Sequence, residues 1–225
     1  MTEITDHFAH IRERVALAAR RSAKHVMIVA VSKGQPAEAI DRVYAAGQRH
    51  FGESYVQEAL PKIEALRGRD IEWHFIGRVQ ANKTRPIAEH FHWVHTVDRE
   101  KVAVRLNDAR PHYAPPLNVL LQVNLAGEPQ KGGVSEAELA PLVAAVSRLP
   151  RLALRGLMTI PPAEASADES AALFDRLKSL QDRFAAEHPG MDVLSMGMSG
   201  DFELAIACGS TCVRIGTAIF GPRRR

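Results

Sequence analysis

Lys33 is the side chain whose position in this sequence best fits covalent chemistry. It lies two residues after the apolar run 26–31, in the segment Val31-Ser-Lys-Gly34. A lysine that is partly removed from water at the end of a strand is more often neutral, and the neutral amine is the nucleophile that forms an imine with an aldehyde. Position alone also fits a surface or ion-paired lysine. Lys33 therefore indicates imine chemistry only in combination with other groups.

Two glycine-rich segments near the C-terminus could bind a phosphate group. They are Ser195-Met-Gly-Met-Ser-Gly-Asp201 and Arg214-Ile-Gly-Thr217, and they offer small residues, a hydroxyl group and backbone N–H groups. Glycine lets the backbone approach an anion closely, and a helix predicted from about residue 200 would direct its positive end toward that anion. Each segment alone also fits a turn that closes the fold. Together with Lys33, they describe a cofactor with a phosphate at one end and an aldehyde at the other, pyridoxal 5'-phosphate (PLP).

Short apolar segments and helical patterns alternate along the chain. The strands and helices that they predict must position Lys33 and the two glycine-rich segments. The run 26–31 is continuously apolar, which is typical of a parallel strand covered on both faces. Strands are predicted over 26–31, 50–52, 72–76, 93–95, 117–123, 152–157, 193–195 and 212–215. Helices are predicted over 3–22, 36–46, 54–66, 82–89, 98–109, 135–148, 167–187 and 200–207.

This order of elements predicts an α/β fold, a single (β/α)8 TIM barrel with an additional N-terminal helix, as one domain over residues 1–225. Right-handed crossovers make the closed barrel the economical topology. An open doubly wound sheet is the alternative, because the strands within 193–215 are short and rich in glycine. Enzymes with this barrel carry their chemistry at the C-terminal ends of the strands. Lys33 and both glycine-rich segments fall at such positions.

Composition predicts a cytoplasmic protein that binds neither membranes nor nucleic acids. The start of the chain lacks the apolar centre of a signal peptide, and no stretch has the roughly 20 apolar residues that span a bilayer. The formal net charge of +3 equals the contribution of the final residues Arg223, Arg224 and Arg225. A basic stripe interleaved with aromatic residues, which nucleic-acid binding would favour, is absent. Cys208 and Cys212 are interpreted as reduced thiols.

Several motifs, in this order, resemble the family of PLP homeostasis proteins, whose fold is like the N-terminal domain of bacterial alanine racemases. The resemblance extends over nearly the whole chain, which makes it more specific than any single glycine-rich motif. The motifs are Val29-Ala-Val-Ser-Lys33, His74-Phe-Ile-Gly77, Gln80-Ala-Asn-Lys83, Gly156-Leu-Met158, Ser195-Met-Gly-Met-Ser-Gly-Asp201, Gly209-Ser-Thr211, Val213-Arg-Ile-Gly-Thr-Ala218 and Ala218-Ile-Phe-Gly221.

The resemblance implies a role for each residue of the expected cofactor site. Lys33 would hold PLP as a Schiff base, and Arg214 would lie beside the pyridine nitrogen. A guanidinium does not readily give up its proton, so that nitrogen would stay unprotonated and the cofactor would be a weaker electron sink. The residues that would bind the phosphate are Ser199, Gly200, Gly216 and Thr217.

The sequence departs from the family pattern at a few positions. Gly52-Glu-Ser-Tyr55 stands where the family commonly has Gly-Glu-Asn-Tyr, and Arg78 and Val79 precede Gln80 in place of the usual residues. Ser54, Arg78 and Val79 are therefore left out of the expected site. Lys131 matches a second lysine that the family links to cofactor traffic, and it equally fits an exposed loop lysine.

Two functions remain open, a carrier of PLP and a PLP-dependent amino-acid racemase. Racemisation needs bases on both faces of the substrate imine, and Lys33 could serve one face. The opposing tyrosine of alanine racemases comes from a second domain and a partner subunit, whereas this chain ends at the barrel. Tyr44 and Tyr113 are expected away from the barrel mouth. Tyr55 could approach it, although packing is its expected role.

We therefore predict a non-catalytic PLP protein that takes part in intracellular PLP homeostasis by buffering the cofactor and delivering it to PLP-dependent apo-enzymes. A monomer is expected. His90, His92 and His95 form a histidine-rich run, but no carboxylate or thiolate completes a metal shell beside it, so no metal site is predicted.

Overall fold

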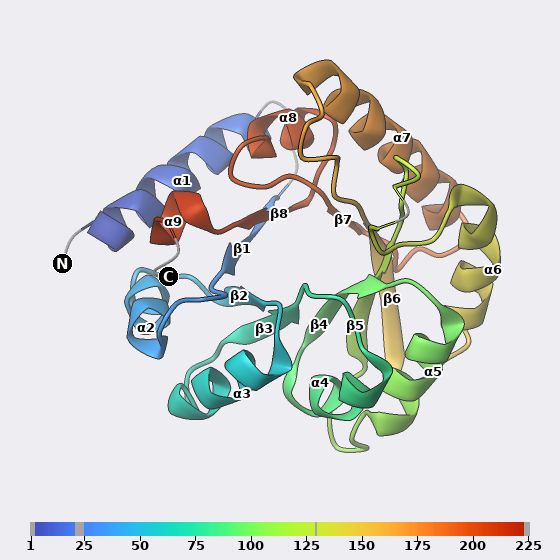
Figure 1. Cartoon of the computed structure of the whole chain (residues 1–225), viewed down its shortest axis with the longest axis horizontal. Helices are drawn as coiled ribbons and strands as arrows, with labels where there is room; N and C mark the ends of the chain where they lie inside the picture. Colours follow the sequence, from blue (N-terminus) through green and yellow to red (C-terminus); the bar gives the residue numbers. More distant parts are fainter. Residues whose placement is uncertain (1–2, 21–24, 129, 223–225) are drawn as a thin grey trace.

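A closed barrel of parallel strands forms the centre of the molecule (Figure 1). The computed structural model describes residues 3–20, 25–128 and 130–222. Strand order follows the sequence, and β1 pairs with β8 to close the barrel. The strands are β1 (Met27–Val31), β2 (His50–Glu53), β3 (Glu72–Phe75), β4 (Trp93–Val97), β5 (Leu117–Gln122), β6 (Leu152–Met158), β7 (Val193–Ser195) and β8 (Cys212–Ile215). The predicted TIM barrel is confirmed, and the open sheet is excluded.

Helices surround the barrel, and the additional N-terminal helix α1 (Glu3–Arg20) packs against the last two helices of the chain. The other helices are α2 (Ala37–Ala45), α3 (Val56–Ala65), α4 (Thr84–His90), α5 (Glu100–Ala109), α6 (Glu136–Val146), α7 (Ala167–Ala185), α8 (Phe202–Ala207) and α9 (Thr217–Phe220). All predicted helices are present with slightly different ends. The sequence analysis missed α9 and the 3-10 turn η1 (Ala81–Lys83), because elements of three or four residues carry no detectable periodicity.

Alternation along the strands separates two apolar clusters. Successive strand residues point to opposite faces of a sheet, so Val29 packs inside the barrel while Ala30 packs outward against the helices. The outer cluster between strands and helices is the larger one. The inner cluster consists of Val29, Trp93, Leu120, Met158, Val193 and Cys212. Polar side chains occupy other inward positions of the same strands, and they are described below.

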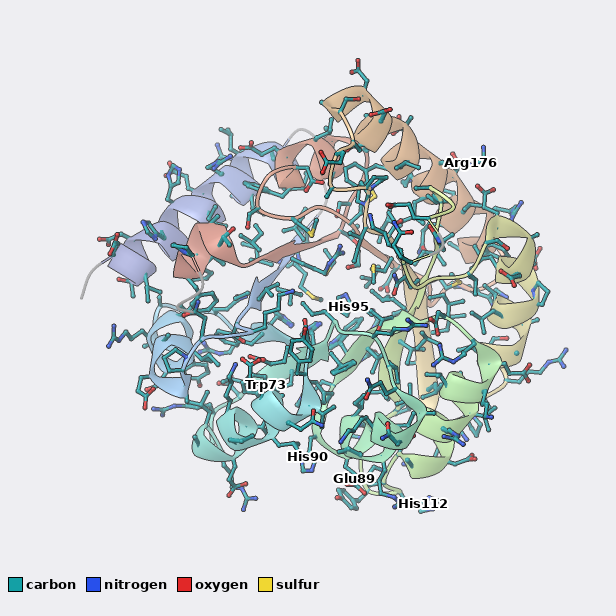
Figure 2. The ribbon with its side chains drawn as sticks, in the orientation of Figure 1. Trp73, Glu89, His90, His95, His112 and Arg176 are labelled. Atoms are coloured by element: carbon teal, nitrogen blue, oxygen red, sulfur yellow. The ribbon has the colours of Figure 1, made fainter. Side chains whose placement is uncertain are left out.

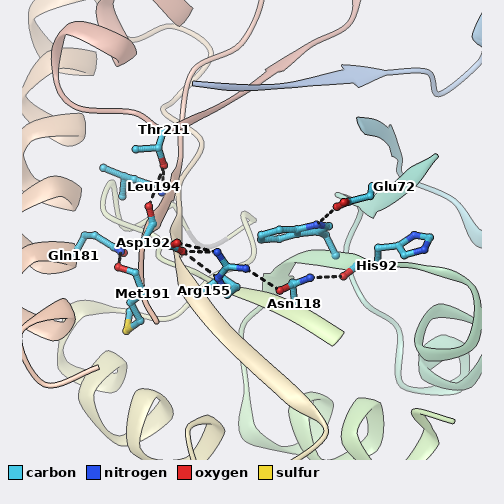
Figure 3. Close-up of polar contacts among 10 residues, drawn as sticks. Glu72, His92, Asn118, Arg155, Gln181, Met191, Asp192, Leu194 and Thr211 are labelled. Carbon is cyan, nitrogen blue, oxygen red and sulfur yellow. Dashed lines mark hydrogen bonds and ion pairs between the residues drawn. The ribbon is translucent and has the colours of Figure 1, made fainter. Parts of the chain in front are cut away.

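Polar contacts tie neighbouring strands together toward the N-terminal end of the barrel (Figure 3). Arg155 on β6 forms an ion pair with Asp192, with 2.7 Å between Nη2 and Oδ1, and its Nη1 donates to Asn118 Oδ1 at 3.2 Å. The amide of Asn118 in turn donates to the carbonyl of His92 at 3.2 Å. These contacts link β4 to β7 at the face opposite the expected site.

Arg223, Arg224 and Arg225, which supply the net charge, lie outside the described residues. Within residues 3–20, 25–128 and 130–222, none of the helices combines the length and the apolar character needed to cross a membrane.

Candidate functional site

Lys33 lies at the mouth of the barrel, two residues beyond the end of β1. Val29 points into the barrel, and the chain turns at Lys33 and Gly34, directly after β1. The Lys33 side chain is half-buried and lines a cavity of about 480 Å³. Ser54, Tyr55 and Lys83 are among the other residues that line this cavity. The position expected for the imine-forming amine is therefore next to a ligand-sized space.

A buried ion pair anchors the turn that carries Lys33. The Lys62 ammonium donates to the carbonyl of Ser32 at 3.0 Å and to Glu53 Oε1 at 2.9 Å, and the Ser32 hydroxyl donates to the same Glu53 oxygen at 2.6 Å. Glu53 is fully buried and Lys62 nearly so. Burial raises the pKa of Glu53, although the hydrogen bonds from Ser32 and Lys62 oppose this shift. The backbone N–H of Gly34 also donates to Glu58. No sequence pattern predicted this anchor.

The two glycine-rich segments meet at the same end of the barrel. The backbone N–H of Ala218 donates to Ser199 Oγ at 3.4 Å, which joins the loop after β7 to the start of α9. Thr217 is the first residue of α9, so its N–H has no acceptor within that helix. The helix expected from residue 200 begins at Phe202, and the Asp201 carboxylate before it accepts the N–H of Met198 at 2.6 Å. The Asp201 carboxylate thus lies at the start of α8, and the expectation that this helix end faces an anion stays a prediction.

The two expected phosphate-binding glycines have different surroundings. A Cβ atom placed on Gly200 would meet no atom within 4 Å, so this side of the loop is open. A Cβ atom on Gly216 would lie 3.3 Å from Cβ and from the carbonyl oxygen of Val31. Gly216 therefore lets β8 lie close to β1 where both strands reach the mouth. Hydroxyl and backbone N–H groups around an open space are the donor set that a phosphate requires.

Arg214 is buried inside the barrel, close to its mouth. Its Nη1 donates to Ser195 Oγ at 2.7 Å, and its Nη2 donates to the carbonyl of Thr159 at 3.1 Å. In the parallel ladder, Arg214 on β8 pairs with Val29 on β1. Burial lowers the pKa of Arg214 from the usual arginine value. The guanidinium is thus held by strands on two sides, in the wall that also leads to Lys33.

The structure corrects several expectations about neighbouring residues. Ser54 and Arg78, which the sequence analysis left out of the site, line the Lys33 cavity. Tyr55 was expected to pack, but its side chain is 65% exposed and lines the same cavity. Val79 is buried, in agreement with its omission. Lys131 is half-buried rather than exposed, because it pairs with Glu128 and donates to the carbonyl of Pro161 at 3.0 Å.

The histidine-rich run does not gather at one place. His90 is exposed on α4, whereas His95 is buried in the barrel interior (Figure 2). A different group forms across β2 and β3, where the ligand atoms of His50, Glu72 and His74 lie within 4.8 Å of one another. Sequence spacing gave no sign of this group, because it depends on the register between the two strands. A hydrogen bond already joins His50 to His74, and Glu72 already accepts one from Trp93.

Comparisons with known proteins agree with this architecture. Residues 7–224 match the family described as alanine racemase, N-terminal domain. The chain is 50% identical over 232 residues to the pyridoxal phosphate homeostasis protein of Escherichia coli, covering 99% of this chain and 98% of that one. It is 49% identical over 230 residues to the protein of the same name from Vibrio cholerae, with coverage of 99% and 98%.

Among solved structures, PipY of Synechococcus elongatus with PLP bound has a TM-score of 0.86 and 38% sequence identity, over 97% of this chain and 100% of PipY. Coverage at this level includes nearly the whole chain. This chain belongs to the family of pyridoxal phosphate homeostasis proteins, which is built on the alanine racemase N-terminal domain.

Proposed function

We propose that this protein binds PLP as a Schiff base on Lys33 and takes part in PLP homeostasis in the cytoplasm, by buffering the cofactor and delivering it. One observation carries the proposal. Lys33 lines a cavity at the mouth of the barrel, and Arg214 and the open loop that contains Gly200 belong to the same end of the barrel, where Gly200 lines a separate cavity. This arrangement occurs in a family whose member PipY has been solved with PLP bound.

The described residues fit PLP group by group. Ser199, Gly200, Gly216 and Thr217 would hold the phosphate through hydroxyl and backbone N–H groups, and the open space beside Gly200 supports this assignment. Lys33 would provide the amine for the aldehyde carbon. Arg214 would donate a hydrogen bond to the pyridine nitrogen. When bound, PLP supplies a reactive aldehyde that forms reversible imines with amines.

The choice between a carrier and a racemase depends on a second base. Arg214 keeps its proton and leaves the pyridine nitrogen unprotonated, which is compatible with either function. A racemase needs a base opposite Lys33. Among the described tyrosines, Tyr44 bonds to Asp70 and Tyr113 is 90% exposed. Tyr55 lines the Lys33 cavity and is the tyrosine on which racemase activity would depend.

Delivery requires that the bound cofactor can be reached. Tyr55 and Arg78 are exposed and line the Lys33 cavity. This supports transfer of the cofactor from the mouth to a PLP-dependent apo-enzyme. The proposal takes the carrier to be a monomer.

Titration of the purified protein with PLP, followed by visible absorbance, tests this function. The wild-type protein should develop the absorbance of a lysine imine, and Lys33→Ala should abolish it. Lys83→Ala is the matched control, because Lys83 lines the same cavity, and it should retain the imine band. Loss of the band in Lys83→Ala with retention in Lys33→Ala would overturn the assignment. Lys33-dependent exchange of the Cα proton of an amino acid with deuterated solvent, abolished in Tyr55→Phe, would favour the racemase.

A further inference from the structure

A continuous row of polar side chains crosses the interior of the barrel, where apolar residues are usual. His50 Nδ1 lies 3.1 Å from His74 Nε2, and His74 Nδ1 lies 2.9 Å from His95 Nε2. His95 Nδ1 lies 3.0 Å from Ser195 Oγ, to which Arg214 Nη1 donates at 2.7 Å. We call His50, His74 and His95 the imidazole row, with Ser195 and Arg214 at its upper end.

The row runs from the N-terminal end of the barrel to its mouth. His50 is the first residue of β2, His74 and His95 are central in β3 and β4, and Ser195 is the last residue of β7. His74 and His95 are both 0% exposed. The indole of Trp93 stacks on His74 with 5.4 Å between ring centroids and 8° between the ring planes, which fixes the plane of that imidazole.

Burial keeps the inner imidazoles neutral. It lowers the pKa of His74 and of His95 well below the usual histidine value, and the charge of Arg214 adds to this effect at His95. A neutral imidazole has one N–H donor and one acceptor nitrogen. Because both nitrogens of each inner ring lie within the row, the proton position in one ring dictates the proton position in the next. The row has only two complete arrangements, with every proton toward Ser195 or every proton toward His50.

At the lower end of the row, beside His50, the Glu72 carboxylate favours the arrangement in which every proton points toward Ser195. Glu72 Oε2 lies 3.6 Å from His50 Nδ1, and it also accepts a hydrogen bond from Trp93 Nε1 at 2.8 Å (Figure 3). A carboxylate beside His50 Nδ1 stabilises a proton on that nitrogen. That proton then points to His74 Nε2, which leaves His74 Nδ1 to donate to His95.

At the upper end of the row, the hydrogen bonds of Ser195 are compatible with this arrangement. The Ser195 oxygen has two lone pairs, one for His95 Nδ1–H and one for Arg214. The hydroxyl proton can then turn to the Cys212 thiol, with which Ser195 also interacts. No donor in the row then meets another donor. In the opposite arrangement, the Ser195 hydroxyl would donate its proton to His95 and could not donate it to Cys212.

We propose that Glu72 and His50 set one proton arrangement along the imidazole row, and that this arrangement fixes the position of Arg214 at the barrel mouth. The histidine rings then donate toward the mouth, and the Ser195 oxygen accepts from both His95 and Arg214. His50, His74 and His95 are positioning residues for Arg214. The effect on PLP, through the position of Arg214 beside the pyridine nitrogen, rests on the proposed function.

Other charged and titratable groups act on the row from several elements. His25, before β1, and Glu72, on β3, act on His50, while His92, before β4, acts on His74. Arg214, on β8, acts on His95. Glu72 is the acidic group among them, so the inferred arrangement depends on this carboxylate.

Nitrogen-15 NMR of the histidine rings, recorded on protein without PLP, tests the arrangement directly. The wild-type spectrum should show His74 and His95 as neutral Nδ1–H tautomers. Glu72→Gln removes the charge but keeps an oxygen for Trp93, and it should convert part of both populations to the Nε2–H tautomer. His50→Phe should do the same. His90→Gln is the matched control, since His90 lines the cavity that His50 and Glu72 also line, and it should change neither ring.

Nε2–H tautomers in the wild-type protein, or unchanged tautomers in both row variants, would overturn the proposal. A second readout separates it from the proposed function. If the wild-type protein binds PLP, Glu72→Gln and His50→Phe should each lower PLP affinity, while His90→Gln should not. Unchanged affinity in both row variants would show that the row does not act on the mouth. If the wild-type protein does not bind PLP, the proposed function fails. The proton arrangement along the imidazole row is then tested by the tautomers alone.

Discussion

Val29 on β1 lies directly opposite Arg214 on β8 in the parallel ladder that closes the barrel. Parallel strands leave a barrel at the same end, so Lys33 and the segment that contains Gly216 and Thr217 emerge side by side at the mouth. The pairing explains how groups at opposite ends of the sequence form one candidate site. It also means that Arg214 lies in the wall formed by β1 and β8, while Lys33 lies in the turn that follows β1.

Gly200→Ala should weaken PLP binding without weakening the fold. The added methyl group would meet no protein atom within 4 Å, and it would extend into the space assigned to the phosphate. The affinity for PLP should therefore fall at least several-fold while the free energy of unfolding stays unchanged. Gly190→Ala is the control, since its Cβ would make only an ordinary contact, 3.6 Å from the carbonyl of Leu154. Equal affinities in the two variants and the wild type would rule out phosphate binding beside Gly200.

Glu53 should make stability fall as pH rises above the ordinary carboxyl range. Burial raises the pKa of Glu53 from a reference value of 4.5, so the folded state binds its proton more tightly than the unfolded state does. The stabilising contribution of this proton is complete below about pH 4.5 and is lost as pH rises through the folded pKa. Urea denaturation from pH 4 to pH 8 should show the wild type losing stability relative to Glu53→Gln.

The control for this experiment is Glu89→Gln, on the exposed surface of α4 (Figure 2). Its stability should run parallel to that of the wild type over the same pH range. A wild type that gains stability relative to Glu53→Gln as pH rises would contradict the direction of the shift.

Ser166 should stabilise α7 as its N-cap. The Ser166 hydroxyl accepts the backbone N–H of Glu169 at 3.2 Å, and the Glu169 carboxylate accepts the N–H of Ser166 at 2.8 Å. This is a capping box, and replacing such a serine by alanine typically costs about 1 kcal/mol. The free energy of unfolding of Ser166→Ala, measured in urea, should fall by that amount. Ser147→Ala, at the C-terminal end of α6, should cost less.

Both cysteines should be slow to react in the folded protein. Burial raises the pKa of the Cys208 thiol and of the Cys212 thiol to about 11. Since the thiolate is the reactive form, alkylation by iodoacetamide at pH 7.5 should be slow until the protein is unfolded. Mass spectrometry of samples with and without urea measures the difference. Rapid modification of native Cys212 would contradict its burial inside the barrel.

The sequence predicted the barrel well, because β1 is a continuous apolar run and short apolar segments alternate with helical patterns along the rest of the chain. The site residues stay a prediction. Lys33 and the glycine-rich segments follow strands, and Arg214 lies near the end of β8, which is the functional end of a barrel. Tyr55 was expected to pack because it is aromatic, but exposure depends on how the loop after β2 lies over the mouth.

Other features could not be predicted, since they depend on the register between strands. His50, His74 and His95 are 24 and 21 residues apart, and only the strand alignment turns all three inward. The anchor formed by Glu53 and Lys62 likewise joins a strand to a helix. Neither group has a spacing that a sequence pattern describes.

The attachment point of the cofactor is the most direct test of the account. The protein is mixed with PLP, reduced with borohydride so that any imine becomes a stable amine, digested, and mapped by mass spectrometry. The account predicts a pyridoxyl group on the peptide that contains Lys33 and its absence from that peptide in Lys33→Ala. A pyridoxyl group found on Lys83, Lys131 or another lysine, with Lys33 unmodified, would contradict it.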